Sequence, residues 1–540
     1  MKLMVSFVIA LGFCFISFLG INSQEVSQQT AHPKSSQPRL SHLVKKGSEV
    51  PDKGGRFQEF GDVYWLEQGG LVFWASVSRP NKKNEEWGLF SFKDGQTRTL
   101  LMEGENSLPT EISATKESKP EKIHLRKADR QRWGTWDLKT PIHKSRQLLY
   151  FSFFNEKYVG DNFGSVYTWD GVRLRKVLGW KDLLEVRGSR YEINSARVLN
   201  ISPEGEALIY FEIKGGQNGL GLYDGTQLTP LLMSGDALPE LQGVLVRKVV
   251  VRPRIVGAPC ALPLYNFCTP ITAWVFPNVI WAALEVTGAP YKKAIFRLTK
   301  EKAEMILAEF KSDPLDPKES MGSFLAMDAA NPNSVIIRAS KFSGEVLLHY
   351  RDGQFYKVFD KSLSGVVKFP HFRWKDPQGW RDYSVENGFF LRSDKSQYVF
   401  PVTFSRPGGT QVSVSSGAVE TTYWAENLSS LFLFDGEHLI NLSETTQMPW
   451  GFSVRKINGN FIGLLISEPE YVMSRNALLK VPTPKKWFLD ANSEELRLQQ
   501  VPELLTDGDK RITLADVVVW KSPGEAIARL DDGLYLFTGK

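Results

Sequence analysis

The chain has 540 residues, of which 42% are hydrophobic, 12% aromatic and 23% charged, and its formal net charge is +6 at pH 7. This weak positive charge lacks the strongly basic field that is typical of nucleic-acid-binding proteins, so no nucleic-acid partner is expected. The length would allow several ordinary domains, and one closed repeat architecture would accommodate it equally well.

The first 23 residues have the pattern of a secretory signal peptide. Lys2 gives a charged start, an apolar run covers Val5–Ile21, and small residues suited to cleavage lie near Ser23. A membrane span is the alternative, but no basic stop-transfer cluster follows the run. Cys14 lacks the small preceding residue of a lipobox, so lipidation is not expected. The sequence therefore predicts a secreted or periplasmic protein, a flexible segment over 24–38, and no transmembrane segment in the mature chain.

A hairpin phrase recurs through the rest of the chain. Gly88–Gly95 alternates apolar with small or polar residues and ends in Asp-Gly, a dipeptide that tolerates the positive φ angles of a tight turn. Each copy is preceded by a nearly continuous apolar run, which indicates a strand buried on both faces. The copies end at Asp94-Gly95, Asp170-Gly171, Asp224-Gly225, Asp352-Gly353 and Asp435-Gly436, with weaker ones at 294–298, 477–481 and 533–537, and the preceding runs cover 71–75, 148–153, 207–211, 279–283, 335–339, 398–402, 461–465 and 526–528.

These copies predict a β-propeller. With a shorter strand upstream, such as Val517–Trp520, each unit has four strands, and radially stacked four-stranded units are propeller blades. Eight blades are counted, with seven as the alternative because the copy at 477–481 is weak. The last copy ends after a third strand, while Leu40–Pro51 matches the fourth-strand tail Leu228–Pro239. We therefore predict an all-β fold, a single propeller over 39–540, closed by an N-terminal strand that completes the last blade.

The repeated phrase resembles a known group of proteins. The hairpin Gly221–Gly225 and the tail Leu231–Pro239 look like the tandem repeats of bacterial secreted propeller-type proteins, over most of the mature chain. Ile201–Gly205 also resembles the Ser-Pro-Asp-Gly turn of TolB-like propellers, with Glu204 in place of Asp. The resemblance implies the fold and export. Because such families include binding proteins, scaffolds and enzymes, no catalytic residue is carried over.

The chain shows no catalytic or metal-binding motif. Its seven histidines are scattered, and no pair has the three- or four-residue spacing of two metal ligands on one helical face. A serine-hydrolase elbow, a phosphate loop and a dinucleotide fingerprint are all missing. We interpret the Asp residues of the Asp-Gly phrases as turn formers rather than as the paired carboxylates of a glycosidase. No catalytic residue, cofactor or metal ion is therefore expected.

Cys260 and Cys268 are predicted to form a local disulfide. They are close in the sequence, and in an oxidising compartment two such thiols pair readily. A metal-binding pair is the alternative, but no histidine or further cysteine lies nearby.

Two segments outside the repeat are candidate binding regions. The basic insertion 115–147 includes Arg132 and Trp133 and would face an anionic glycan, a lipid headgroup or an acidic protein; a solvated loop is the alternative. The segment 369–383 alternates aromatic and cationic residues. Trp rings stack on sugars and Arg binds carboxylates, so an acidic polysaccharide would fit it, with packing between blades as the alternative. Its candidate residues are Arg373, Trp374, Trp380 and Arg381.

The sequence favours a non-catalytic extracytoplasmic protein whose propeller loops bind a protein or a glycan. The alternative is a polysaccharide hydrolase or lyase with a site at the central channel, which predicts His, Arg and carboxylate side chains gathered at the ends of the inner strands. A structural subunit of an envelope complex is the third class, and it predicts a broad exposed apolar patch.

Overall fold

The fold was determined as a computed structural model, in which the compact unit Pro38–Lys540 holds all the strands that follow. The structure describes residues 39–51, 53–66, 70–82, 84–103, 115–116, 149–154, 164–170, 174–202, 205–250, 273–360, 382–385, 388–392, 395–416, 419–442, 453–457, 463–467, 471–474, 477–480, 486–490, 498–507, 510–522 and 524–539. None of these segments forms a helix with the length and hydrophobicity that a membrane crossing requires.

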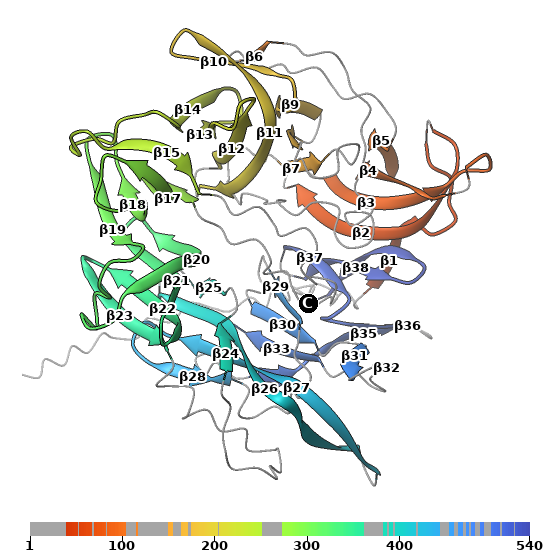
Figure 1. The fold of residues 1–540 in the computed structure, drawn as a ribbon. Helices are drawn as coiled ribbons and strands as arrows, with labels where there is room; N and C mark the ends of the chain where they lie inside the picture. The colour runs from red at the N-terminus through yellow and green to blue at the C-terminus, as the bar shows by residue number, and fades with distance from the viewer. Residues whose placement is uncertain are drawn as a thin grey trace, which may run out of the picture. The chain divides into compact units, whose positions relative to one another are not determined.

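The fold is all-β, and its described strands form eight antiparallel sheets of three or more strands, which we number I to VIII (Figure 1). Sheet I contains β2 (Arg56–Leu66), β3 (Gly70–Ser78), β4 (Glu86–Lys93) and β5 (Gln96–Met102). Sheet II contains β7 (Leu149–Phe154), β8 (Gly164–Trp169) and β9 (Leu174–Leu178). Sheet III contains β6 (Thr115–Lys116), β10 (Leu183–Val186), β11 (Ser189–Ile201), β12 (Ala207–Ile213), β13 (Asn218–Tyr223) and β14 (Leu228–Met233). Sheet IV contains β15 (Leu245–Val249), β16 (Ala273–Phe276), β17 (Val279–Thr287), β18 (Lys293–Leu298) and β19 (Ala303–Ala308).

The second half of the chain continues the series. Sheet V contains β20 (Met321–Asn331), β21 (Ser334–Lys341), β22 (Gly344–Arg351) and β23 (Gln354–Phe359). Sheet VI contains β24 (Asp382–Val385), β25 (Phe389–Arg392), the long hairpin β26 (Gln397–Ser416) and β27 (Val419–Phe434), and β28 (Leu439–Asn441). Sheet VII contains β29 (Ser453–Ile457), β30 (Gly463–Ser467), β33 (Lys486–Asp490) and β34 (Leu498–Gln500). Sheet VIII contains β37 (Val517–Ser522), β38 (Glu525–Leu530), β39 (Gly533–Thr538) and β1 (Arg39–Lys45), and two separate hairpins are β31 (Tyr471–Ser474) with β32 (Ala477–Lys480) and β35 (Glu503–Asp507) with β36 (Lys510–Thr513).

In seven of its eight copies, the hairpin phrase of the sequence forms the strand that pairs with the preceding apolar run. Asp94 and Gly95 have φ angles of 51° and 77°, and Asp352 and Gly353 have 50° and 86°, as a type I′ turn requires. In the other form of the turn, the Asp224 carboxylate accepts hydrogen bonds from the backbone N–H groups of residues 226 and 227, at 2.7 and 2.8 Å. Asp94, Asp224 and Asp352 thus lie in turns, as predicted.

The described parts of the predicted apolar runs lie in β3, β7, β12, β17, β21, β26, β30 and β38, and most of their described side chains are buried. Seven consecutive residues of β3, from Leu71 to Val77, are buried, and so are the first five of β12. One of the eight predicted third strands is wrong. Residues 477–480 form β32, whose one partner among the described strands is β31, and the third strand of sheet VII is β33. Apolar alternation identifies a strand but not its partner, and the β31–β32 hairpin is an excursion between the second and third strands of that sheet.

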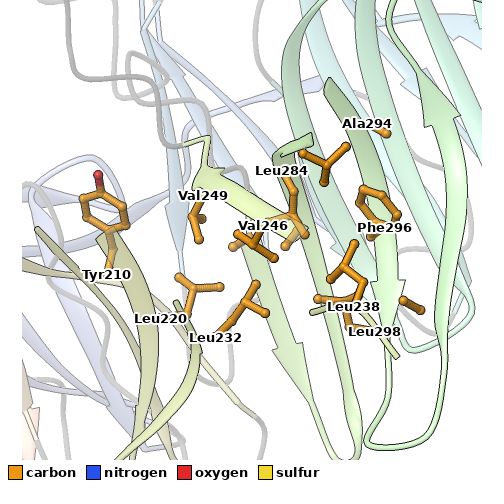
Figure 2. Packing of buried hydrophobic residues seen from close by; sticks show 14 of the residues in the cluster. Tyr210, Leu220, Leu232, Leu238, Val246, Val249, Leu284, Ala294, Phe296 and Leu298 are labelled. Atoms are coloured by element: carbon orange, nitrogen blue, oxygen red, sulfur yellow. The ribbon is translucent and has the colours of Figure 1, made fainter. Parts of the chain in front are cut away.

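Hydrophobic clusters join each sheet to the next along the chain. Sheets III and IV share a core that includes Leu220 and Leu232 on one side and Leu284 and Phe296 on the other (Figure 2). Comparable clusters join sheets I and II, II and III, IV and V, V and VI, VI and VII, and VII and VIII. A further cluster contains Phe57 and Phe73 of sheet I together with Ile527 and Leu534 of sheet VIII.

The N-terminal strand β1 pairs with β39 and thereby becomes the fourth strand of sheet VIII (Figure 1). Its register brings Arg39 opposite Thr538 and Lys45 opposite Gly533. The predicted match between Leu40–Pro51 and the tail Leu228–Pro239 is also seen in three dimensions, because β1 and β14 are both fourth strands. The N-terminal strand therefore covers the edge that β39 would otherwise expose.

His349 makes the stability of the core depend on pH. Its ring is fully buried, one nitrogen lies 2.8 Å from the Ser334 hydroxyl, and burial lowers the pKa of His349 to about 4. Because this folded-state value lies below the unfolded value of 6.5, the stabilisation is complete above pH 6.5 and is lost as the pH falls through 4. We expect the free energy of unfolding to fall by about 3 kcal/mol over that range. Denaturant titrations at several pH values should show this slope in the wild type and not in His349→Gln.

Candidate functional site

Four connections between successive sheets share one backbone motif. A residue that follows the last strand of one sheet donates its backbone N–H to the carbonyl oxygen of a residue in the first strand of the next sheet. The N–H of that second residue donates in turn to the carbonyl oxygen of the residue that comes directly after the first. In the connection from sheet III to IV, Gly235 donates to Val246 at 2.7 Å, and Val246 donates to Asp236 at 2.8 Å. The residues at the first position are Gly47, Lys181, Gly235 and Phe310, with φ angles of 81°, 63°, 97° and 60°.

Phe310 is the residue that fits this position worst. A positive φ suits glycine, and a bulky aromatic residue adopts it only with strain. Phe310 nevertheless has a φ of 60°, and its N–H donates to Met321 at 2.8 Å. Its side chain is 75% exposed, so it gains nothing from burial that would offset the strain. Strained, exposed aromatic residues of this kind point to a function outside the fold itself.

A buried ion pair holds the loop that carries Phe310. Asp313, which is 1% exposed, forms an ion pair with Lys341 at the end of β21, and Lys341 also lies 3.4 Å from Glu319. The second oxygen of Asp313 accepts the Leu315 N–H at 2.9 Å. Burial disfavours the charge of Lys341, but Asp313 first and then Glu319 outweigh it and raise the pKa of Lys341. The β19–β20 loop is thus fixed to the β21–β22 turn.

The same pair of loops exposes two more apolar side chains. Phe342 is fully exposed in the β21–β22 turn, and Leu315 is 42% exposed. The neighbouring Ser343 hydroxyl donates to Glu319 at 3.0 Å, which fixes the turn that carries Phe342. We call Phe310, Leu315 and Phe342 the Phe310–Phe342 surface. These three exposed apolar side chains lie on two loops that Lys341, Asp313, Glu319 and Ser343 join to each other, and exposed aromatic side chains on a fixed support are suited to contact with a partner.

A small cavity lies between sheets IV and V, and one of its lining residues, Glu309, directly precedes Phe310 in the chain. Its walls are mainly apolar, and the Glu309 carboxylate, which is 7% exposed, lines it together with Lys293. One Glu309 oxygen accepts the Phe324 N–H at 3.0 Å, and the other lies 3.9 Å from the Lys293 amine. Lys293 also lies 3.8 Å from Glu285. The lining residues are Val250, Ala283, Leu284, Lys293, Ala294, Ile295, Glu309, Phe324, Leu325, Ala326 and Met327.

Sheet VIII carries a second group of titratable side chains. Asp532 accepts hydrogen bonds from the Tyr535 hydroxyl at 2.7 Å and from Lys510 at 2.8 Å, and His42 stacks on the Tyr535 ring at 4.0 Å. The hydrogen bond from Lys510 lowers the pKa of Asp532, whereas burial raises the pKa of Tyr535 and lowers that of His42. Tyr535 therefore stays protonated and acts as a donor. The group fixes the β35–β36 hairpin to sheet VIII rather than supplying a nucleophile.

The binding and disulfide residues predicted from the sequence lie outside the described residues. This applies to Arg132, Trp133, Arg373, Trp374, Trp380, Arg381, Cys260 and Cys268. Of the basic insertion, Thr115–Lys116 is described, and it pairs with β10 as a strand of sheet III. Among the described residues, no three His, Cys, Asp or Glu side chains are placed so that they could hold a metal ion.

Sequence reasoning missed the Phe310–Phe342 surface, although one signal for it was present. The tail that gives Gly47 and Gly235 has a further copy after β19, Ile306-Leu307-Ala308-Glu309-Phe310. In this copy phenylalanine stands where the other two have glycine. That departure from the repeat, rather than the repeat itself, marks the site.

The successive antiparallel sheets, four of which have four described strands, define a protein of the β-propeller type. No protein-family model matches the sequence, and no curated protein matches it. Among solved structures, the chain is similar to the β-propeller domain of the Trilobed protease from Pyrococcus furiosus, with 11% identity, 84% of this chain and 99% of that one covered, and a TM-score of 0.36.

Two other similarities are weaker. The Pyrococcus horikoshii acylaminoacyl peptidase has 10% identity and a TM-score of 0.34, and the similarity covers 87% of this chain and 59% of the peptidase. The α-L-arabinofuranosidase Arb93A of Fusarium graminearum has 10% identity and a TM-score of 0.26, covering 75% of this chain and 99% of that one. At TM-scores below 0.5, none of these similarities supports an argument about function.

Proposed function

We propose that the chain is a non-catalytic, extracytoplasmic binding protein that contacts a protein partner through the Phe310–Phe342 surface. The strained backbone of Phe310 carries this proposal. Glycine stands at the equivalent positions 47 and 235, so a glycine at 310 would relieve strain in the fold. An exposed phenylalanine at position 310 is expected if its aromatic ring contributes to binding.

The proposed architecture is a closed propeller of eight blades. Seven clusters join each of the sheets I to VIII to its successor, and the cluster of Phe57, Phe73, Ile527 and Leu534 joins sheet VIII back to sheet I. The pairing of β1 with β39 supports closure by the N-terminal strand. The proposed secretory signal over residues 1–23 and the proposed disulfide between Cys260 and Cys268 agree with an oxidising location outside the cytoplasm.

The catalytic alternative requires several inner strands to bring His, Arg and carboxylate groups together. Of the described first strands, β2 carries Glu59, β11 carries Arg197, β20 carries Asp328 and β29 carries Arg455. Arg197 lies 5.2 Å above the Tyr210 ring in its own sheet. The strained Phe310 favours binding, and we propose no reaction.

Replacing Phe310 by glycine tests the proposal directly. We expect Phe310→Gly to leave the free energy of unfolding unchanged or to raise it by about 1 kcal/mol, because the positive φ no longer carries a side chain. Combined with Phe342→Ser, it should abolish recovery of a stoichiometric partner. The measurement is affinity purification of the mature, chemically cross-linked protein from its native source at low and at raised salt, followed by mass spectrometry.

The matched control is Ile440→Ser in sheet VI. Ile440 is 41% exposed, so its replacement removes a similar apolar side chain from a different sheet. We expect this variant to retain every partner that the wild type retains. If the double variant and Ile440→Ser recover the same proteins in the same amounts, the Phe310–Phe342 surface does not bind them and the proposal is wrong.

A further inference from the structure

The cavity beside Phe310 has the chemistry of a binding site for a positively charged group. Glu309 is more than nine-tenths buried, and only one of its oxygens has a hydrogen bond, from the Phe324 N–H at 3.0 Å. The other oxygen is 3.9 Å from the Lys293 amine, which is too far for a hydrogen bond. A buried carboxylate in apolar surroundings is costly unless it is fully paired. The second oxygen therefore has an unused capacity to accept a hydrogen bond.

The size of the cavity selects a small cation. Its volume is about 20 Å³, which is room for roughly one water molecule or one ammonium group. A guanidinium group is planar and wider, so it would not enter. Ile295, Phe324 and Met327 line the cavity and offer apolar contact to a methylene chain. These dimensions and walls fit a primary ammonium group at the end of an alkyl stem.

Lys293 gives the site a means of accepting that cation. Its amine lies between Glu285 and Glu309, at 3.8 and 3.9 Å, so neither contact is a close ion pair. Glu285 is 26% exposed and Glu309 is 7% exposed, so Glu285 is the better hydrated partner. The three groups together carry one net negative charge, which attracts a cation. Movement of Lys293 toward Glu285 would leave Glu309 to the incoming ammonium.

We propose that the Glu309 cavity binds a primary ammonium group, and that a lysine side chain of the protein partner supplies it. The proposal that a partner's lysine supplies the ammonium group rests on the proposed function of the Phe310–Phe342 surface, because Phe310 directly follows Glu309 in the chain. The proposal that the cavity binds an ammonium group depends on the cavity alone. The two are therefore tested with separate reagents.

The test uses the full mature chain labelled with ¹³C at the methionine methyl groups. Met327 lines the cavity and is 3% exposed, and its signal is assigned as the one that Met327→Leu removes. The probe is Nα-acetyl-lysine-N-methylamide. We expect it to shift the Met327 signal with saturation, and we expect the Nε-acetylated form of the same probe to have no effect, because it lacks the charge.

Three variants and a second probe sharpen the test. Glu309→Gln should weaken probe binding at least tenfold. Lys293→Met should strengthen probe binding several-fold, because it removes the competing amine. Met473→Leu, outside the cavity lining, should not change probe binding. Methylammonium chloride binding as tightly as the lysine probe would contradict the partner's lysine as the source. If neither amine shifts Met327 in the wild type or in Lys293→Met, the cavity holds only solvent and the inference fails, whatever partner the Phe310–Phe342 surface binds.

Discussion

Lys341→Met should lower the free energy of unfolding by about 3–5 kcal/mol, because it leaves a buried carboxylate without its partner. Asp313, in the β19–β20 loop, is 1% exposed, and Lys341 at the end of β21 compensates its charge. Glu319 loses the same amine, which lies 3.4 Å from it. The measurement is equilibrium denaturation in guanidinium chloride. Because this ion pair fixes the loop that carries Phe310, the variant should also lose its protein partner.

The control for Lys341→Met is Lys214→Met. Lys214 forms a comparable ion pair with Glu192 at 3.0 Å, but the two side chains are 70% and 38% exposed. Water screens such a pair, so its loss should cost less than about 1 kcal/mol. The double variant Lys341→Met, Asp313→Leu should recover much of the lost stability, since no buried charge remains. Equal losses in Lys341→Met and Lys214→Met would show that Asp313 is not a buried, compensated charge.

Gly533→Ala should destabilise the protein by about 2–4 kcal/mol by pushing β1 away from β39. Gly533 has a φ of 152°, and a Cβ at this position would meet the Val44 carbonyl oxygen and, at 2.6 Å, the His42 ring nitrogen. Both of those residues belong to β1. The measurement is thermal unfolding, combined with limited proteolysis, in which β1 should become susceptible before the rest of the chain.

Gly95→Ala is the control for Gly533→Ala, because it adds backbone strain without a steric clash. Gly95 has a φ of 77°, but no atom lies within 4 Å of where its Cβ would be. We expect this variant to lose only about 1 kcal/mol, the cost of the positive φ itself. Its β1 should remain protected from protease. If Gly533→Ala lowers the melting temperature no more than Gly95→Ala does, the close packing of β1 on β39 is contradicted.

The sequence predicted the repeat, the second strands and the turns, because each leaves a local pattern. The run from Leu71 to Val77 is apolar because both faces of β3 are buried. The Asp-Gly dipeptides recur because glycine takes the positive φ of each turn, while the Asp either shares that conformation, as at 94 and 352, or accepts backbone N–H groups of the turn, as at 224. The match between β1 and β14 was also visible in the residues. These features depend on neighbours in the chain, which the sequence shows directly.

The sequence predicted neither the third strand of sheet VII nor where the site lies. Residues 477–480 have a strand pattern, yet β33 with Trp487 and Phe488 forms the third strand of sheet VII. The choice between them depends on the space beside β30, which no local pattern encodes. Phe310 likewise looks like an ordinary apolar residue at the end of a strand. Its strained conformation accompanies the hydrogen bonds by which Phe310 donates to Met321 and Met321 donates to Lys311, and only the assembled connection brings these groups together.

The pairing of β1 with β39 also governs when the protein can finish folding. The Thr538 hydroxyl reaches the Arg39 carbonyl across 499 positions of the chain. Contacts of such separation form slowly, because a long loop must close before they contribute any stability. Although β1 is synthesised before every other strand of the fold, it has no partner until β39 has emerged. The first strand to be made is therefore among the last to be placed.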